Sequence, residues 1–294
     1  MRKKILLIIT PLLLCAWGHN TFAVNSSPKK KQLVLDKVTV NYFDYRDEEL
    51  EDNEEYKLLI ANDSLILVGA YELSFLYNNS GDLHGINTVS KAPPIYTELT
   101  LNQQKQLERI KIIEGNTLVA KTAITYSDNL LQQIQAKELN TNTELLLRYV
   151  YNKEQLPSIV KGVEGVEDRY GRSSDTLQIS FEYNKDRQLI MVDGKDRKFQ
   201  LSYDKANNPY ADLPYFYTHE SQPILDFLFY TNYKQKHNIT RIEDSEELTT
   251  ITYTYNQNNL PITAIAKNIL KQYPTYPRSF TQYEYSYKEI EIIE

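Results

Sequence analysis

The sequence predicts an all-β protein, built as a curved antiparallel meander of degenerate β-hairpin repeats with one short helical insertion. Three observations lead to this prediction. The 294-residue chain contains 24 tyrosines, a residue type that favours pleated surfaces. A motif of two aromatic residues, separated by one position and followed by asparagine, recurs along the chain. One apolar segment interrupts the series of motifs, and it carries helix signals instead.

The motif is clearest in RYVYNKEQLPSIV, at residues 148–160, and TYTYNQNNLPITA, at residues 252–264. Clear copies of its core lie at residues 75–78, 149–152, 181–184 and 253–256, and weaker copies at 99–102, 201–204 and 285–288. A leucine follows the motif after a short polar stretch at five places: Leu83, Leu107, Leu156, Leu189 and Leu260.

Each copy predicts a β-hairpin. Alternation of aromatic and polar residues is typical of a strand with two different faces. Asparagine followed by polar residues predicts a turn of roughly three to five residues, and the apolar pair after it begins the returning strand. The step from the leucine to the next apolar residue breaks strict alternation, so either the leucine belongs to the turn or a β-bulge intervenes. Successive hairpins pair edge to edge, and the sheet curls because strands twist.

The first 23 residues predict a secretory signal peptide. Arg2, Lys3 and Lys4 precede an apolar stretch from residue 5 to 16, and Thr21, Phe22 and Ala23 form a small-residue cleavage site. Residues 24–294 then form a single hairpin-repeat domain. We expect it to be periplasmic, associated with the outer membrane or extracellular. Lipidation of Cys15 is the alternative, although Leu14 precedes it where such signals place a small residue.

The charge of the chain argues against nucleic acid as a partner. The formal net charge is −6, and removal of the signal peptide leaves 30 basic against 39 acidic residues, or −9. Binding to phosphate backbones requires a basic surface. No later stretch reaches eighteen uninterrupted apolar residues, so we expect no transmembrane helix. Partners among other proteins stay open.

The interruption at residues 208–233 is the predicted helical insertion. Ser221 is a candidate helix cap, Pro223 suits a first helical turn, and ILDFLFYTNY follows. Apolar residues lie nearly all round this short helix, which predicts that it is buried. Because a sheet with one apolar face needs a cover, we expect the insertion to plug the sheet.

The motif Tyr-x-Tyr-Asn-x-x-x-x-Leu resembles the YD-type (Rhs-like) hairpin repeat of secreted bacterial proteins. More narrowly, residues 71–294 are similar to uncharacterised exported proteins of Bacteroidota, a domain family of unknown function with a reported porphyrin ligand. The resemblance implies a hairpin-repeat architecture. It also implies a planar ligand, whose metal would take a histidine or a tyrosine as axial ligand.

We predict a ligand site where the insertion folds against the tyrosine face of the flanking hairpins. Aromatic rings stack on planar hydrophobic molecules, such as porphyrins, and on sugars. The predicted ligand-binding residues are Tyr203, His219, Phe227, Tyr230, Tyr253 and Tyr255. The alternative is that the tyrosines only pack the sheet. No cofactor is identified.

No metal site is predicted either. Three histidines follow the signal peptide, at positions 84, 219 and 237, and none has metal-ligand spacing. Eight acids lie between residues 44 and 55 without the glycine or spacing of an EF-hand, so a solvated acidic segment is the simpler interpretation.

The sequence leaves two functions open. The first is an exported binding protein, and the alternative is a structural or protein-interaction component of the envelope with no small-molecule ligand. We expect no enzyme, since no catalytic motif occurs. An outer-membrane barrel is disfavoured because Arg148, Glu182 and Glu284 lie on the face opposite the tyrosines, where lipid would require apolar residues.

Overall fold

The computed structural model describes residues 30–44, 66–90, 93–168, 171–194, 197–211, 213, 235–272, 274 and 277–292. Within these residues the chain forms sixteen β-strands and no helix. The strands are β1 (Lys30–Asp44), β2 (Ile66–Tyr77), β3 (Leu83–Val89), β4 (Ile95–Leu101), β5 (Leu107–Glu114), β6 (Thr117–Ser127), β7 (Leu130–Glu138), β8 (Thr143–Tyr151), β9 (Pro157–Asp168), β10 (Gly171–Tyr183), β11 (Leu189–Asp193), β12 (Lys198–Asn207), β13 (His237–Glu243), β14 (Glu247–Tyr255), β15 (Pro261–Leu270) and β16 (Pro277–Ile292).

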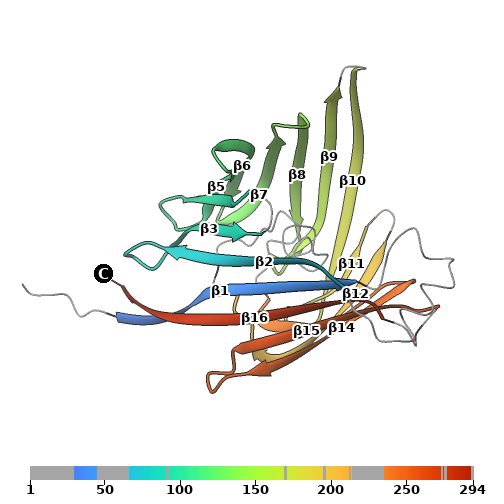
Figure 1. Cartoon of the computed structure of the whole chain (residues 1–294). Helices are drawn as coiled ribbons and strands as arrows, with labels where there is room; N and C mark the ends of the chain where they lie inside the picture. Colours follow the sequence, from blue (N-terminus) through green and yellow to red (C-terminus); the bar gives the residue numbers. More distant parts are fainter. Residues whose placement is uncertain are drawn as a thin grey trace, which may run out of the picture.

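The strands form one antiparallel sheet that closes on itself. Each strand pairs with its neighbour in the sequence, and β1 pairs with β16 along its whole length, from Lys30↔Ile292 to Asp44↔Ser279. Figure 1 shows β1, β2 and β16 running side by side, steeply inclined to the long β9–β10 hairpin. The predicted antiparallel meander is therefore confirmed. The prediction of a curved sheet of hairpin repeats is wrong in that the sheet closes into a barrel, because the accumulated twist brings the first and last strands together and they hydrogen-bond.

The predicted helical insertion is not part of the described fold. The predicted helix itself, with its cap Ser221, lies outside the described residues, as do the signal peptide and nearly all of the acidic segment. At the base of the insertion, Pro209, Tyr210 and Ala211 form a turn. Among the described residues, no helix has the length and apolar character needed to cross a membrane.

The inner face of the closed sheet is apolar and packed. One hydrophobic cluster takes residues from strands all round the barrel, and Phe75, Leu147 and Val160 in it are completely buried. The outer face carries charged side chains that pair across strands, for example Lys111 with Glu98 at 2.8 Å. Large barrels usually leave a water-filled interior, so the buried inner face means that side chains fill this one.

Five of the strand connections repeat one turn, and this turn explains the asparagine in the motif. The side-chain oxygen of the asparagine accepts hydrogen bonds of 2.9–3.1 Å from the backbone N–H groups two and four residues later. The third residue after the asparagine has a positive φ, between 60° and 78°. The five asparagines are Asn78, Asn102, Asn152, Asn184 and Asn256.

All five turns lie at one end of the barrel, which we call the turn end. Each joins an even-numbered strand to the following odd-numbered strand, and in an antiparallel meander these connections share one end. The start of β1 and the finish of β16 lie there too. The motif therefore repeats because one capped turn is used around one end of the barrel.

The structure also decides between the two interpretations of the leucine after the motif. In the two Leu-Pro copies the leucine is the last residue of the turn. The Asn152 N–H donates to the Leu156 carbonyl at 2.9 Å, and the Asn256 N–H donates to the Leu260 carbonyl at 2.9 Å. In the other three copies the leucine begins the returning strand. A register shift accompanies the hairpin in both kinds of copy, for example between Val150 and Tyr151, so a bulge is present as well.

Candidate functional site

A series of tyrosines braces neighbouring strands near the turn end. In each case a tyrosine on an even-numbered strand donates its hydroxyl hydrogen bond, of 2.6–2.9 Å, to a backbone carbonyl of the preceding odd-numbered strand. The donor and acceptor pairs are Tyr77 and Leu35, Tyr126 and Leu107, Tyr151 and Leu131, Tyr203 and Leu189, Tyr253 and Ile239, and Tyr287 and Pro261. We call these residues the tyrosine ladder.

Burial makes five of the six ladder hydroxyls poor acids by raising their pKa. It raises the pKa of Tyr126 to about 12, and burial, together with the nearby Tyr126, does the same for Tyr151. Burial also raises the pKa of Tyr77, Tyr253 and Tyr287 above the usual value. Neutral hydroxyls that donate to carbonyls are structural groups, so the ladder offers a ligand its ring faces and not its O–H groups.

Of the three predicted site residues that the structure describes, two belong to the tyrosine ladder and the third stacks on it. Tyr203 and Tyr253 belong to the ladder, and the rings of Tyr253 and Tyr255 stack with centroids 5.9 Å apart. Tyr255 donates a short hydrogen bond to the Asp204 carboxylate. The other three predicted residues, His219, Phe227 and Tyr230, lie outside the described residues.

Asp204 shows how the insertion joins the repeat. It occupies the asparagine position of the β12 copy, and its carboxylate accepts the N–H of Ala206, two residues later, at 2.9 Å. The second N–H comes from Asn238, at 3.1 Å, after the insertion. The insertion therefore interrupts one of the standard turns without removing its cap. His237, at the start of β13, lies 2.9 Å from the Ala206 carbonyl through its Nδ1 atom.

The base of the insertion folds inward against the tyrosine face. Tyr210 packs edge-to-face on Tyr285 at 6.3 Å, and Tyr285 stacks on Tyr283 at 6.4 Å. Burial raises the pKa of both Tyr210 and Tyr285 well above the usual value. Asn207 fastens the same base to the adjoining turn, since its side-chain amide donates to the Asn258 carbonyl at 3.3 Å.

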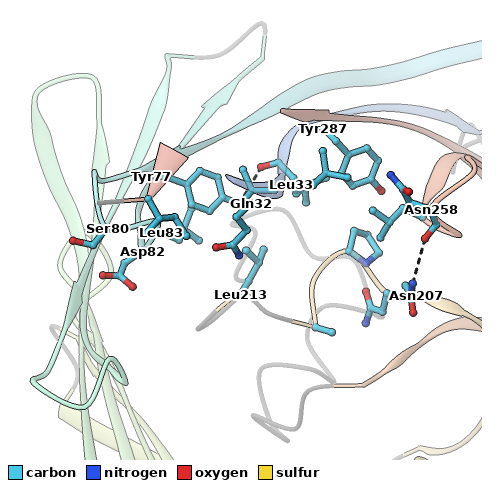
Figure 2. A pocket seen from close by; sticks show the side chains of 18 of the residues that line it. Gln32, Leu33, Tyr77, Ser80, Asp82, Leu83, Asn207, Leu213, Asn258 and Tyr287 are labelled. Carbon is cyan, nitrogen blue, oxygen red and sulfur yellow. Dashed lines mark hydrogen bonds between the residues drawn. The ribbon is translucent and has the colours of Figure 1, made fainter. Parts of the chain in front are cut away.

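A cavity of about 860 Å³ opens at the turn end, beside the base of the insertion; we call it the turn-end cavity. Figure 2 shows Tyr77, Ser80 and Asp82 on one side of it, Tyr287 and Asn258 on the other, and Gln32 and Leu33 between them. It lies at the seam of the barrel, between the start of β1, the finish of β16 and three of the turns. Its volume falls in the range of small-molecule sites, roughly 300–1,000 Å³.

The wall of the turn-end cavity divides into an apolar part and a polar part. Leu35, Leu83 and Leu213 are buried side chains of the apolar part, and the rings of Tyr77 and Tyr287 extend it. The polar part consists of Lys30, Gln32, Ser80, Asp82, Lys105, Asn207, Asn208, Lys236 and Asn258. This combination suits a molecule with an apolar body and a polar end.

Sequence reasoning did not find the turn-end cavity. It placed the site beside Tyr203, Tyr253 and Tyr255, whereas none of these three lines the cavity. The signal that could have found it is the position of Tyr77 and Tyr287 in the first and last copies of the motif, because closing the barrel brings these copies together. The predicted site and the cavity share one part of the chain, the base of the insertion, where Asn207, Asn208 and Leu213 contribute to the cavity wall.

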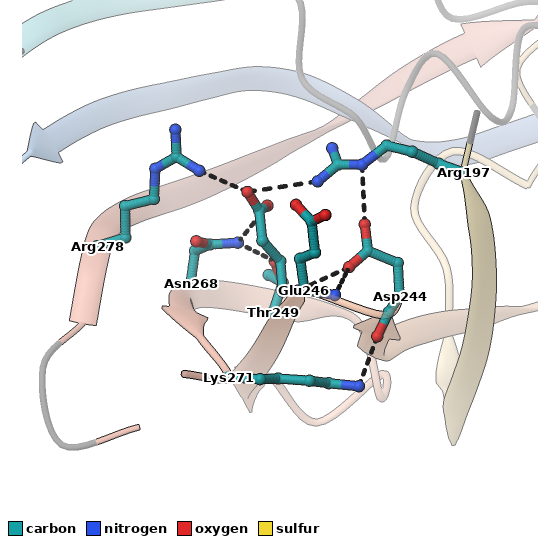
Figure 3. A network of polar contacts seen from close by, with 8 residues as sticks. Arg197, Asp244, Glu246, Thr249, Asn268, Lys271 and Arg278 are labelled. Atoms are coloured by element: carbon teal, nitrogen blue, oxygen red, sulfur yellow. Dashed lines mark hydrogen bonds and ion pairs between the residues drawn. The ribbon is translucent and has the colours of Figure 1, made fainter. Parts of the chain in front are cut away.

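A polar network occupies the opposite end of the barrel (Figure 3). Asp244 caps its own turn through the N–H groups of Glu246 and Glu247, at 2.8 and 2.6 Å, and it forms an ion pair with Arg197 at 3.0 Å. Glu247 in turn lies 2.5 Å from Arg278. The network therefore ties the β11–β12 and β13–β14 connections to the start of β16.

Basic partners face the carboxylates of this network. Hydrogen bonds from Lys271 and then Arg241 lower the pKa of Glu243. Asp244 and Glu247 face Arg197 and Arg278, so the network has the features of a structural clamp. The described part of the chain contains no group of three His, Cys, Asp or Glu side chains placed to hold a metal ion.

Comparisons with known proteins identify the fold but no family. No protein-family model matches the chain, and no curated protein matches it. Among solved structures, the chain is similar to a porin-like protein from Bacteroides uniformis, with a TM-score of 0.52 and 13% identity over 86% of this chain and 96% of that one. A porin-like protein from Bacteroides vulgatus matches with a TM-score of 0.39 and 10% identity over 87% of this chain and 99% of that one.

The first comparison corrects the resemblance drawn from the motif. The resemblance to YD-type hairpin-repeat proteins is wrong, because the similar solved fold is that of a porin-like protein and this chain closes into a sixteen-stranded barrel. The motif misled because an aromatic strand end followed by a capped turn suits any antiparallel hairpin. At 13% identity the likeness concerns the fold alone.

Proposed function

We propose that the chain is an exported binding protein, of the cell envelope or secreted, that holds a small molecule with an apolar body in the turn-end cavity. The observation that carries the proposal is the cavity itself, about 860 Å³ at the seam of a barrel whose inner face is otherwise packed. The predicted signal peptide at residues 1–23 supports export.

A membrane pore is the second candidate, favoured by the closed sixteen-stranded sheet and by the description of the similar structure as porin-like. Two features argue against it. A pore has a polar, water-filled interior and an apolar outer band. Here the inner face holds buried Phe75, Leu147 and Val160, while outward-facing Arg148 and Lys161 are exposed.

Bilayer recordings separate these two candidates. A binding protein with a filled barrel produces no stepwise conductance when it is added to a planar lipid bilayer. Reproducible single-channel steps from the purified protein would refute the binding proposal in favour of the pore.

Binding itself is tested with N-phenyl-1-naphthylamine, a neutral apolar probe whose fluorescence rises in apolar surroundings. We expect saturable binding with one probe per chain. The Asn258→Trp variant places a large side chain at the cavity wall and should weaken binding at least tenfold. Asn258 is exposed and its side chain makes no hydrogen bond within the described residues, so the turn itself is kept.

The matched control is Asp186→Trp. Asp186 lies two residues after Asn184, as Asn258 lies two residues after Asn256, in a turn with the same hydrogen bonds that does not line the cavity. This variant should bind the probe as the parent does. Equal weakening by both variants, or the absence of saturable binding to the parent, would refute the proposed function.

A further inference from the structure

The charges of the turn-end cavity differ from those of the whole chain. The chain has a formal net charge of −6, whereas the cavity wall has three lysines, Lys30, Lys105 and Lys236, and one acid, Asp82. The local excess is therefore two positive charges in an acidic protein.

The pairing within the cavity leaves two of these lysines available. Lys105 forms an ion pair with Asp82 at 2.9 Å. Lys30 and Lys236 have no carboxylate within 4.0 Å among the residues that the structure describes. Ammonium groups without a carboxylate partner at the wall of a partly apolar cavity attract an anion, because low-dielectric walls strengthen the field of each charge.

The two tyrosine hydroxyls in the wall do not compete with the lysines for a charged group. The hydroxyls of Tyr77 and Tyr287 donate to the carbonyls of Leu35 and Pro261, at 2.9 and 2.7 Å. Their rings remain as apolar surface beside the buried leucines of the same wall. The cavity thus combines an apolar wall with unpaired positive charge at its polar part.

We propose that the turn-end cavity binds a single-chain amphiphile with an anionic carboxylate head. The chain lies against the leucines and the tyrosine rings, and the head lies toward the polar part of the wall, which carries Lys30 and Lys236. This inference rests on the proposed function, since it names the ligand class of the same cavity. It adds that charge, and not apolar area alone, selects the ligand.

The test measures the affinities of three probes that share a twelve-carbon chain: dodecanoate, 1-dodecanol and dodecyltrimethylammonium. Each displaces N-phenyl-1-naphthylamine from the full mature chain at a concentration below its critical micelle concentration. We expect dodecanoate to bind about tenfold or more tightly than dodecanol, and the cation to bind most weakly. The preference should shrink in 1 M sodium chloride, which screens charges over about 3 Å.

One variant that removes positive charge and one that removes negative charge then test which residues of the wall attract the anionic head. The double variant Lys30→Gln, Lys236→Gln should weaken dodecanoate about three- to tenfold and leave dodecanol unchanged. Asp82→Asn removes the partner of Lys105 and should strengthen dodecanoate about two- to fivefold. Partial unfolding exposes apolar surface and would raise the affinity for dodecanol as well. A gain for dodecanoate with dodecanol unchanged therefore keeps the test decisive if the first variant is poorly folded.

Two further variants act as controls. Lys121→Gln removes an exposed lysine of β6, away from the cavity, and should change no affinity. Asp82→Asn in a Lys105→Gln background should lose the gain, because the released charge is then absent.

The outcomes separate the inference from the proposed function. Equal affinity for dodecanoate and dodecanol, unchanged by the lysine substitutions, would overturn the anionic ligand class while the cavity remains a binding site. Failure of the neutral probe and of all three amphiphiles to bind would overturn both.

Discussion

Replacing Tyr151 by phenylalanine removes one hydrogen bond of the tyrosine ladder and nothing else. The Tyr151 hydroxyl donates to the Leu131 carbonyl at 2.6 Å, from β8 to β7. Pairing between these two strands begins at Gln133↔Arg148, so Leu131 lies beyond the end of their ladder of backbone hydrogen bonds. The tyrosine therefore supplies a donor that the sheet does not.

The expected cost follows from the burial of the acceptor. Leu131 is only 3% exposed, so water cannot replace the lost hydroxyl as a donor to its carbonyl. A buried acceptor without a partner costs about 1–3 kcal/mol of folding stability. The ring is kept, so no packing area is lost. For a chain of this size, each kcal/mol lowers Tm by about 2–4 °C.

The assay is denaturant unfolding of the mature protein, monitored by circular dichroism. The free energy of unfolding and its dependence on denaturant concentration are compared between the variants. The control is Tyr96→Phe, because the Tyr96 hydroxyl has no hydrogen bond within the part of the chain that the structure describes, and we expect a change below about 0.5 kcal/mol. Equal stability of the Tyr151→Phe variant and the parent would refute the view that the ladder hydroxyls hold the barrel together.

Three further predictions concern the ladder, the turns and the polar network. Because burial raises the pKa of Tyr126 and Tyr151 to about 12, folded protein binds more protons than unfolded protein above pH 10. The stability that these two residues contribute should therefore be complete below pH 10 and be lost as pH rises from 10 to 12. Absorbance at 295 nm should show tyrosine ionising at higher pH in the folded protein than in protein unfolded by denaturant. Asn184→Ala should cost about 1–2 kcal/mol in chemical unfolding by removing two hydrogen bonds to backbone N–H groups, whereas Asn184→Asp, which keeps the acceptor, should cost less than half of that. Glu247→Gln should lower stability by about 1–2 kcal/mol at low salt and by less in 1 M salt, since it breaks the pair with Arg278; equal losses at both salt concentrations would contradict the electrostatic origin.

The local parts of the fold could be predicted from the sequence because their causes are local. The Asn152 side chain accepts hydrogen bonds from the N–H groups two and four residues later, so five consecutive residues determine the turn. The alternation around Tyr149 and Tyr151 likewise assigns the two faces of a strand without reference to the rest of the chain. The strands, the turns and the polar outer face at Arg148 follow from such patterns.

The turn-end cavity could not be predicted from the sequence, because its cause is not local. The insertion was expected to fold against the tyrosine face, and Tyr210 at its base lies against Tyr285. Sequence reasoning chose the tyrosines nearest in the chain, Tyr203 and Tyr253, and their ligand-binding role stays a prediction. Their hydroxyls donate to backbone carbonyls of neighbouring strands. Whether a hydroxyl is available depends on a carbonyl of another strand, and a motif does not contain that partner.

By itself, the sequence determined the hairpins, the capped turns and the apolar inner face, because each arises from residues a few positions apart. The tertiary structure alone decided that the sheet closes and where the turn-end cavity lies. Closure depends on the register between β1 and β16, which pairs Val34 with Lys288, and the same alternation would serve an open sheet. The cavity exists because that seam brings Gln32, Tyr287 and the base of the insertion into one wall. Their common location results from the summed twist of sixteen strands.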